Sequence, residues 1–98
     1  MRVLAVTEAA LRDFDSIYDF VARNNPRAAA DVLRALDKAI QHLTDQPKLG
    51  RVYRHGRHRL RLLTHGNYLI FYRERPGAIE IIRVLDGRRD IPDILDEI

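Results

Sequence analysis

The chain has 98 residues, of which 46% are hydrophobic and 32% charged, a balance typical of soluble globular proteins. It contains no apolar run long enough to span a bilayer, and its N-terminus is too short an apolar run for a signal peptide, so we expect a cytoplasmic protein without a membrane partner. The absence of cysteine excludes disulfides and thiolate chemistry. The length allows one modest core, which predicts a single domain over residues 1–98.

Charge is distributed unevenly along the chain. The net charge is only +3, yet no carboxylate occurs between Asp45 and Glu74. The last nine residues, in contrast, are acidic. The middle of the chain therefore forms a basic block, which indicates an acidic partner; its cations are Lys48, Arg51, Arg54, Arg57, Arg59, Arg61 and Arg73.

The N-terminal part of the chain predicts a strand followed by a helix. Residues 2–6 alternate weakly in polarity, which favours a short edge strand. Thr7 can cap the helix that follows, whose apolar stripe consists of Ala10, Phe14, Ile17, Tyr18 and Val21. We expect the charged residues between them on a solvated outer face, namely Arg12, Asp13, Asp15 and Asp19.

A second helix follows almost at once. Asn25 is a suitable cap, and Pro26 occupies the first helical position, where a missing N–H has no consequence. The stripe of this helix consists of Ala29, Leu33, Leu36, Ile40 and Leu43. Because the connection is so short, the two helices should form an antiparallel hairpin that serves as a structural layer.

The second half of the chain predicts three strands. Residues 44–56 contain Pro47, Gly50 and Gly56 and should form a surface loop. Strands are then expected around residues 59–62, over 68–73 and from residue 78 onward, with turns at 65–67 and 75–77. The expected fold class is α+β: an N-terminal edge strand, an antiparallel helix hairpin, and a three-stranded antiparallel meander with the helices on one face.

The last strand should be the middle of the sheet, because its apolar residues occupy both parities. If Ile82 and Val84 pack under the helices, Arg83 lies on the opposite face beside Ile81 and Leu85. An apolar face that contains an unpaired arginine is expected to be either solvated or covered by another molecule. Alternatively, Arg83 pairs with Glu80 or with a carboxylate elsewhere in the chain. A short C-terminal helix or tail could cover part of this face with Ile91, Ile94, Leu95 and Ile98.

Four segments together resemble the RelE/ParE superfamily of bacterial toxins, and the ParE branch in particular. They are N-P-x-A-A at 25–29, P-K-L-G-R at 47–51, Y-L-I-F-Y-R at 68–73 and I-I-R-V-L-D-G-R-R-D at 81–90. The resemblance extends over nearly the whole chain and carries the family's α+β fold with it. Asp86 departs from it, since many ParE-like sequences have His there.

The resemblance implies two alternative mechanisms. Some RelE-like toxins cut messenger RNA on the ribosome, which requires cations around the phosphate and a proton shuttle. Those nucleases commonly carry Tyr or His after the last strand, and residues 91–98 contain neither. The remaining candidates are the loop histidines His55, His58 and His65 and the carboxylates Glu80 and Asp86, and a loop histidine is more often simply solvated.

The missing shuttle favours the ParE mechanism, in which the toxin binds DNA gyrase and stabilises the cleaved-DNA complex without catalysis. We then expect no catalytic residue, cofactor or metal. The residues facing gyrase, its DNA or an RNA phosphate would be Arg59, Arg61, Arg83, Arg88 and Arg89. Replacing Arg83, Arg88 and Arg89 should reduce toxicity and leave the fold intact. A ribosome-dependent endoribonuclease and a non-toxic member that only binds its antitoxin remain alternatives.

Similarity to this family also implies a partner, an acidic ParD-like antitoxin whose C-terminal segment folds as it wraps the toxin in a hetero-oligomer. Candidate contacts are Leu60, Leu62, Tyr68, Ile81 and Leu85. The same residues could equally be core, an alternative that we favour for Leu60 and Leu62.

Overall fold

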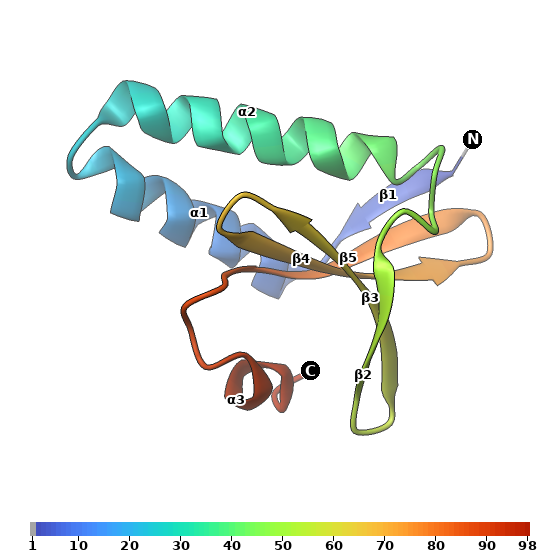
Figure 1. The fold of residues 1–98 in the computed structure, drawn as a ribbon. Coiled ribbons are helices and arrows are strands. Elements are labelled where there is room, and N and C mark those ends of the chain that lie inside the picture. The colour runs from blue at the N-terminus through green and yellow to red at the C-terminus, as the bar shows by residue number, and fades with distance from the viewer. Residues whose placement is uncertain (1) are drawn as a thin grey trace.

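The computed structural model describes residues 2–98 and has an α+β fold (Figure 1). Its elements in chain order are β1 (Val3–Val6), α1 (Glu8–Ala22), α2 (Pro26–His42), β2 (Arg51–His55), β3 (His58–His65), β4 (Tyr68–Arg75), β5 (Ala78–Asp86) and α3 (Ile91–Leu95). The strands form one mixed sheet of five, in the order β1-β5-β4-β3-β2. The predicted fold class is confirmed.

The N-terminal strand lies at the edge of the sheet, as predicted, and runs parallel to β5. The other neighbouring strands pair antiparallel. β5 is an interior strand buried on both faces, as its composition indicated, but the middle of the sheet is β4. The expected position of β5 was therefore wrong by one place, because the basic region supplies an additional strand at the opposite edge.

That additional strand is β2, which lies within the segment predicted to be a loop. Arg51 pairs with Leu62, and His55 pairs with His58 across a tight turn. Gly56 in this turn has φ 57°, a left-handed conformation that glycine adopts without strain. The prediction failed because β2 is a largely exposed edge strand, so its sequence shows no apolar alternation.

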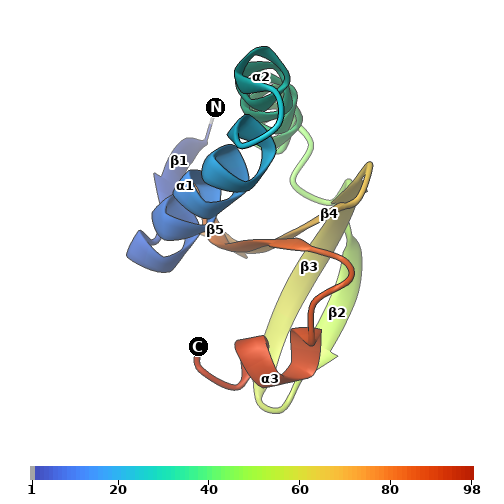
Figure 2. The same ribbon diagram turned by 90° about the vertical axis from the view of Figure 1, so that its left-hand side faces the viewer.

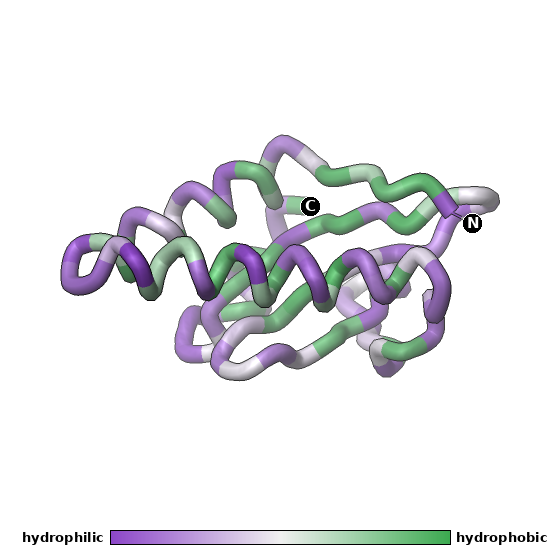
Figure 3. The backbone as a smooth tube through the Cα atoms, turned by 90° about the horizontal axis from the view of Figure 1, so that it is seen from above, coloured by the Kyte–Doolittle hydropathy of each residue, from purple (hydrophilic) through white to green (hydrophobic). Residues whose placement is uncertain are grey.

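Both helix starts follow the predicted capping. The Ala10 N–H donates to Thr7 Oγ1 at 3.1 Å, and the Ala28 N–H donates to Asn25 Oδ1 at 3.1 Å. Helices α1 and α2 form the expected antiparallel pair over one face of the sheet (Figure 1). Along both helices apolar and polar positions alternate, whereas the strands beneath are apolar over long stretches (Figure 3).

The sheet separates two apolar clusters. The first lies between the sheet and the helix pair and includes Leu36, Ile40, Ile70 and Tyr72. The second lies on the opposite face, where α3 packs against the sheet (Figure 2). Its buried members are Leu60, Leu62, Phe71, Ile82, Leu85, Ile91 and Leu95. The C-terminal segment therefore covers this face, as a short helix, and closes a second core.

A β-bulge in β5 changes which side chains face the helices. Phe71 pairs with Arg83 but the next residue, Tyr72, pairs with Ile81, so Ile82 is an extra residue on β5. Ile81 and Val84 consequently both belong to the cluster under the helices, while Ile82 lies in the cluster beside α3. The expectation that Ile82 and Val84 share a face was wrong, because it assumed uninterrupted alternation.

Candidate functional site

Arg83 forms a two-pronged ion pair with Asp13 of α1. Arg83 Nε donates to Asp13 Oδ2 at 2.7 Å, and Nη2 donates to Oδ1 at 2.8 Å. The side chains are only 13% and 6% exposed, and the hydrogen bonds to Asp13 raise the pKa of Arg83. Of the two interpretations, pairing with a carboxylate is therefore confirmed, although the partner is Asp13 rather than Glu80. Asp13 does not lie on a solvated face, contrary to expectation.

Asp13 also completes the backbone hydrogen bonding of β5. Strand β1 ends at Val6, so beyond Ile81 the edge of β5 has no neighbouring strand. The Thr7 hydroxyl donates to the Ile82 carbonyl at 2.8 Å, and the Val84 N–H donates to Asp13 Oδ2 at 2.9 Å. These two side chains take the place of a strand at that edge.

The sequence did contain a signal for the burial of Asp13. This residue is three positions after Ala10 and four before Ile17, which places all three on one side of the helix. Ala10 and Ile17 both belong to the cluster under the helices. A carboxylate within an apolar stripe indicates a buried cation as its partner, since an unpaired buried charge is strongly unfavourable.

Arg88 and Arg89 lie in the turn after β5, where Asp86 holds Arg88 in place. Arg88 Nε donates to Asp86 Oδ1 at 3.0 Å, Arg88 Nη2 to Oδ2 at 2.8 Å, and the Arg88 N–H to Oδ1 at 2.9 Å. These bonds lower the pKa of the Asp86 carboxyl. The Arg88 side chain remains 76% exposed, so it is oriented and still accessible.

Beside this turn is a cavity of about 290 Å³, which we call the corner cavity. Its apolar wall is formed by Ile17, Phe20, Tyr68 and Val84, and its remaining lining residues are Asp13, Ser16, Asp86, Arg88 and Arg89. Phe20 is 58% exposed, an unusual position for a phenylalanine. Burial raises the pKa of Tyr68, which lines the same cavity.

A second cavity, of about 570 Å³, is lined mainly by cationic residues, and we call it the basic cleft. Arg59 and Arg61 line it, whereas Arg83, Arg88 and Arg89 do not. Its other lining residues are Arg2, Lys48, Val52, Leu60, Arg73, Glu74, Arg75, Pro76 and Gly77. Arg59 and Arg61 therefore lie at the basic cleft and Arg88 and Arg89 at the corner cavity, while Arg83 lines a third cavity, of about 620 Å³, that also includes Arg73, Arg75 and Arg89.

The candidate histidines lie on β2 and β3 and line neither the corner cavity nor the basic cleft. His55 Nε2 lies 2.6 Å from Asp96 Oδ1, which connects β2 to the C-terminal end of α3. None of His55, His58 and His65 lines the basic cleft. Within residues 2–98, no group of three or more His, Asp or Glu side chains is arranged to hold a metal ion.

Four of the five candidate antitoxin contacts are core residues. Leu60, Leu62, Ile81 and Leu85 are at most 5% exposed. Core positions were an open alternative for all five residues and the favoured one for Leu60 and Leu62; because helices cover both faces of the sheet, Ile81 and Leu85 are core residues and not surface contacts. Tyr68 is half-buried and remains accessible at the corner cavity.

Comparisons with known proteins agree with this architecture. Residues 4–91 match the family model described as the ParE toxin of the type II toxin-antitoxin system, parDE. No curated protein sequence matches the chain. A solved structure titled "Chromosomal ParDE TA system from P. aeruginosa" superposes with a TM-score of 0.74 at 24% identity, covering 88% of this chain and 96% of that chain.

The family match runs from the second residue of β1 to the first residue of α3 and includes α1, α2 and the strands β2 to β5. None of the helices in the described part of the chain is long and apolar enough to cross a membrane. Because the family model covers residues 4–91, the chain belongs to the ParE family and is a ParE-type toxin of a type II toxin–antitoxin system.

Proposed function

We propose that this toxin inhibits DNA gyrase by stabilising the cleaved-DNA complex, and that a cognate ParD-like antitoxin neutralises it. The observation that carries the proposal is the family match over residues 4–91. The similar solved structure is itself titled as a ParDE system, which supports an antitoxin as partner.

The lining of the basic cleft supports inhibition by contact rather than by catalysis. Cleavage of RNA requires a group that removes a proton from the 2′-hydroxyl and a group that protonates the leaving oxygen. The residues that line the cleft include no histidine and no tyrosine. The one carboxylate that lines the cleft is Glu74, whose Oε2 lies 3.8 Å from Arg2 Nη2 and thus forms an ion pair. The cleft can hold an anion but lacks a proton relay.

The corner cavity supports a protein partner on that side of the molecule. Its apolar wall can receive an apolar side chain, and Arg88 and Arg89 at its rim can pair with carboxylates. This combination suits an acidic antitoxin segment. An antitoxin bound over Tyr68 and Phe20 would also cover the two arginines that we propose to face gyrase, so that neutralisation would result from occlusion.

A gyrase assay with purified components tests the proposal. The toxin is incubated with gyrase, ATP and supercoiled plasmid, and linear DNA is measured after detergent and protease treatment. Toxin-dependent linear DNA is the expected result. Normal gyrase activity together with messenger RNA cleavage in a translating extract would replace the proposal by the endoribonuclease alternative. Normal activity in both assays, with harmless overexpression of folded protein, would indicate the non-toxic alternative.

A further inference from the structure

The basic cleft lies where two hairpins of the sheet separate. Strands β3 and β4 pair from His65 and Tyr68 as far as Arg61 and Tyr72, and no further. Beyond that point β3 pairs with β2, and β4 pairs with β5. Figure 1 shows the β2–β3 hairpin pointing away from the β4–β5 turn. The cleft lies between these two hairpins, and residues of both hairpins line it.

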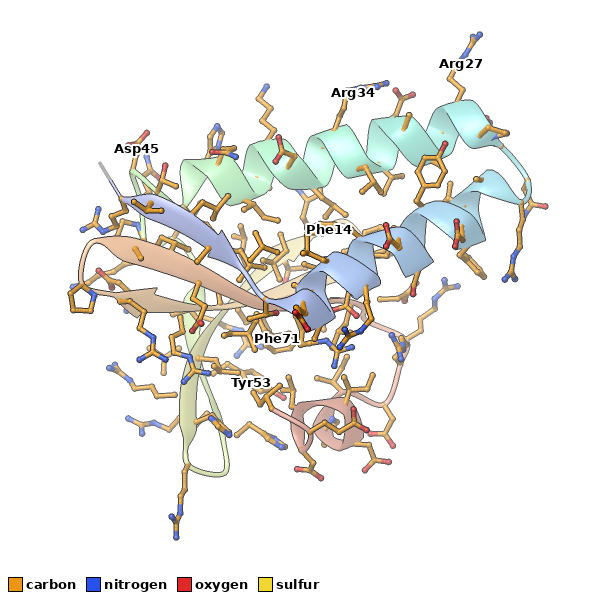
Figure 4. All side chains as sticks on the ribbon, turned by 180° about the vertical axis from the view of Figure 1, so that it is seen from behind. Phe14, Arg27, Arg34, Asp45, Tyr53 and Phe71 are labelled. Carbon is orange, nitrogen blue, oxygen red and sulfur yellow. The ribbon has the colours of Figure 1, made fainter. Side chains whose placement is uncertain are left out.

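Positive charge in this cleft exceeds the negative charge available to neutralise it. Six cations line it, namely Arg2, Lys48, Arg59, Arg61, Arg73 and Arg75, and Glu74 is the single carboxylate among its lining residues. Glu80 lies nearby and is shared, since its Oε1 is 3.5 Å from both Arg73 Nε and Arg75 Nε. Many nitrogen-ended side chains gather beside this hairpin (Figure 4). Since only two carboxylates lie among or beside the six cations, most of the positive charge remains available to bind an anionic ligand.

Arg73 lines the cleft and has one side-chain nitrogen that forms no hydrogen bond within residues 2–98. Its Nε atom is buried and has no hydrogen-bond partner in the described part of the chain. A buried donor without an acceptor is uncommon in folded proteins. Because this atom is itself buried, a ligand in the cleft would contact the other guanidinium nitrogens of Arg73, while Nε keeps its ion pair with Glu80 Oε1 at 3.5 Å.

Arg61 is held in position by the loop that precedes β2. Arg61 Nη1 donates to the Gly50 carbonyl at 2.8 Å. The loop is fixed in turn by Tyr72, whose hydroxyl accepts from the Gly50 N–H and donates to the Pro47 carbonyl, both at 2.8 Å. A guanidinium that is already ordered loses little conformational freedom on binding.

We propose that the basic cleft binds the sugar–phosphate backbone of duplex DNA. Arginine and lysine are the side chains that contact phosphates in such complexes. No aromatic residue lines the cleft, and base stacking on aromatic side chains is the usual means of holding single strands. The few apolar lining residues, Val52, Leu60 and Pro76, offer little to a peptide, in contrast to the corner cavity. This contact goes beyond the proposed function and requires no gyrase.

The test uses a labelled DNA duplex of mixed sequence, with binding followed by fluorescence anisotropy between about 50 and about 200 mM salt. The test variant carries Lys48→Gln, Arg59→Gln and Arg75→Gln, which are exposed residues at the cleft. The matched control carries Arg23→Gln, Arg27→Gln and Arg34→Gln, which are exposed and lie in or beside the helix pair; Arg27 and Arg34 are labelled in Figure 4. Both variants lose the same charge, and circular dichroism confirms folding of each.

We expect the cleft variant to bind at least about tenfold more weakly and its salt dependence, the slope of log K against log salt, to decrease by about 3. The control variant should bind as the unmodified toxin does. Equal weakening of both variants would overturn the proposal in favour of a general charge effect. Absence of duplex binding, or tighter binding to single-stranded RNA or to a glutamate-rich peptide, would also overturn it. Since the assay contains no gyrase, its failure is distinguishable from failure of the proposed function.

Discussion

The Asp13 carboxylate of α1 binds both the Arg83 guanidinium and the Val84 backbone N–H of β5, with Oδ2 accepting from Arg83 Nε at 2.7 Å and from Val84 at 2.9 Å. Asp13 and Arg83 are 70 positions apart in the chain. This contact connects the first helix to the strand that leads into the Arg88–Arg89 turn. Because of this contact, Asp13 and Arg83 are largely buried, although both are charged residue types that are usually found at the surface.

Replacement of Asp13 should therefore destabilise the fold strongly. Asp13→Ala leaves the largely buried Arg83 without a counterion, and we expect the free energy of unfolding to decrease by about 3 kcal/mol. Urea unfolding followed by circular dichroism measures this value. Asp15→Ala is the matched control, because Asp15 is exposed on the same helix and its loss should change stability by less than about 0.5 kcal/mol. Equal stability of the two variants would contradict the structural role of Asp13.

The arginines of the turn should affect toxicity much more than stability, because the Arg88–Asp86 pair is largely exposed on the Arg88 side and such pairs contribute little. Arg88→Gln with Arg89→Gln removes two exposed cations at the proposed gyrase-facing surface. Growth arrest on induced expression should weaken, while the urea midpoint changes little. Arg23→Gln with Arg27→Gln removes the same charge near the connection of the two helices and should retain full toxicity. The sequence alone suggested that Arg83 could be included in such a variant, but its buried ion pair makes that replacement a change in stability.

The pKa of Asp86 should depend on Arg88. Since the folded-state pKa of this carboxyl is lowered, its stabilising contribution is complete at neutral pH. That contribution is lost as the pH falls through the ordinary aspartate value of about 3.9 and then through the lower folded value. Arg88→Gln removes the two side-chain hydrogen bonds and should raise the Asp86 pKa, which an NMR titration of the carboxyl carbon measures.

Arg89→Gln is the control for this titration, because Arg89 acts on Asp86 only through a weak charge interaction. Its effect on the Asp86 pKa should be much smaller than that of Arg88→Gln. Equal shifts in the two variants would indicate that net charge, rather than the hydrogen bonds, lowers this pKa.

The corner cavity should contribute to antitoxin binding through Phe20. Phe20→Ala removes the exposed aromatic ring from its wall, and we expect the affinity for a cognate antitoxin to decrease at least about tenfold, as for an aromatic anchor at an interface. Leu11→Ala is a suitable control, because Leu11 is 53% exposed on the same helix and does not line the cavity. Isothermal titration calorimetry with the purified antitoxin distinguishes the variants, and similar affinities for both would exclude the cavity as the contact.

Much of the fold could be predicted because its signals are local. Thr7 and Asn25 cap their helices through backbone groups three residues away, and the glycines of the tight turns need no distant partner. The order of elements and the family resemblance also follow from short segments of sequence. Strand β2 was missed for the same reason, since an exposed edge strand depends on its partner and carries little signal of its own.

The sequence by itself determined the capped helix pair, the apolar strands and the concentration of cations in the middle of the chain. Only the tertiary structure decided which cations are available to a partner. Asp13 holds Arg83 in a largely buried ion pair, and the bulge at Ile82 changes the faces of the residues around it. The separation of two hairpins gathers Arg59, Arg61 and Arg73 around one cleft. These outcomes depend on contacts between residues distant in sequence, and side-chain alternation within a single strand carries no information about them.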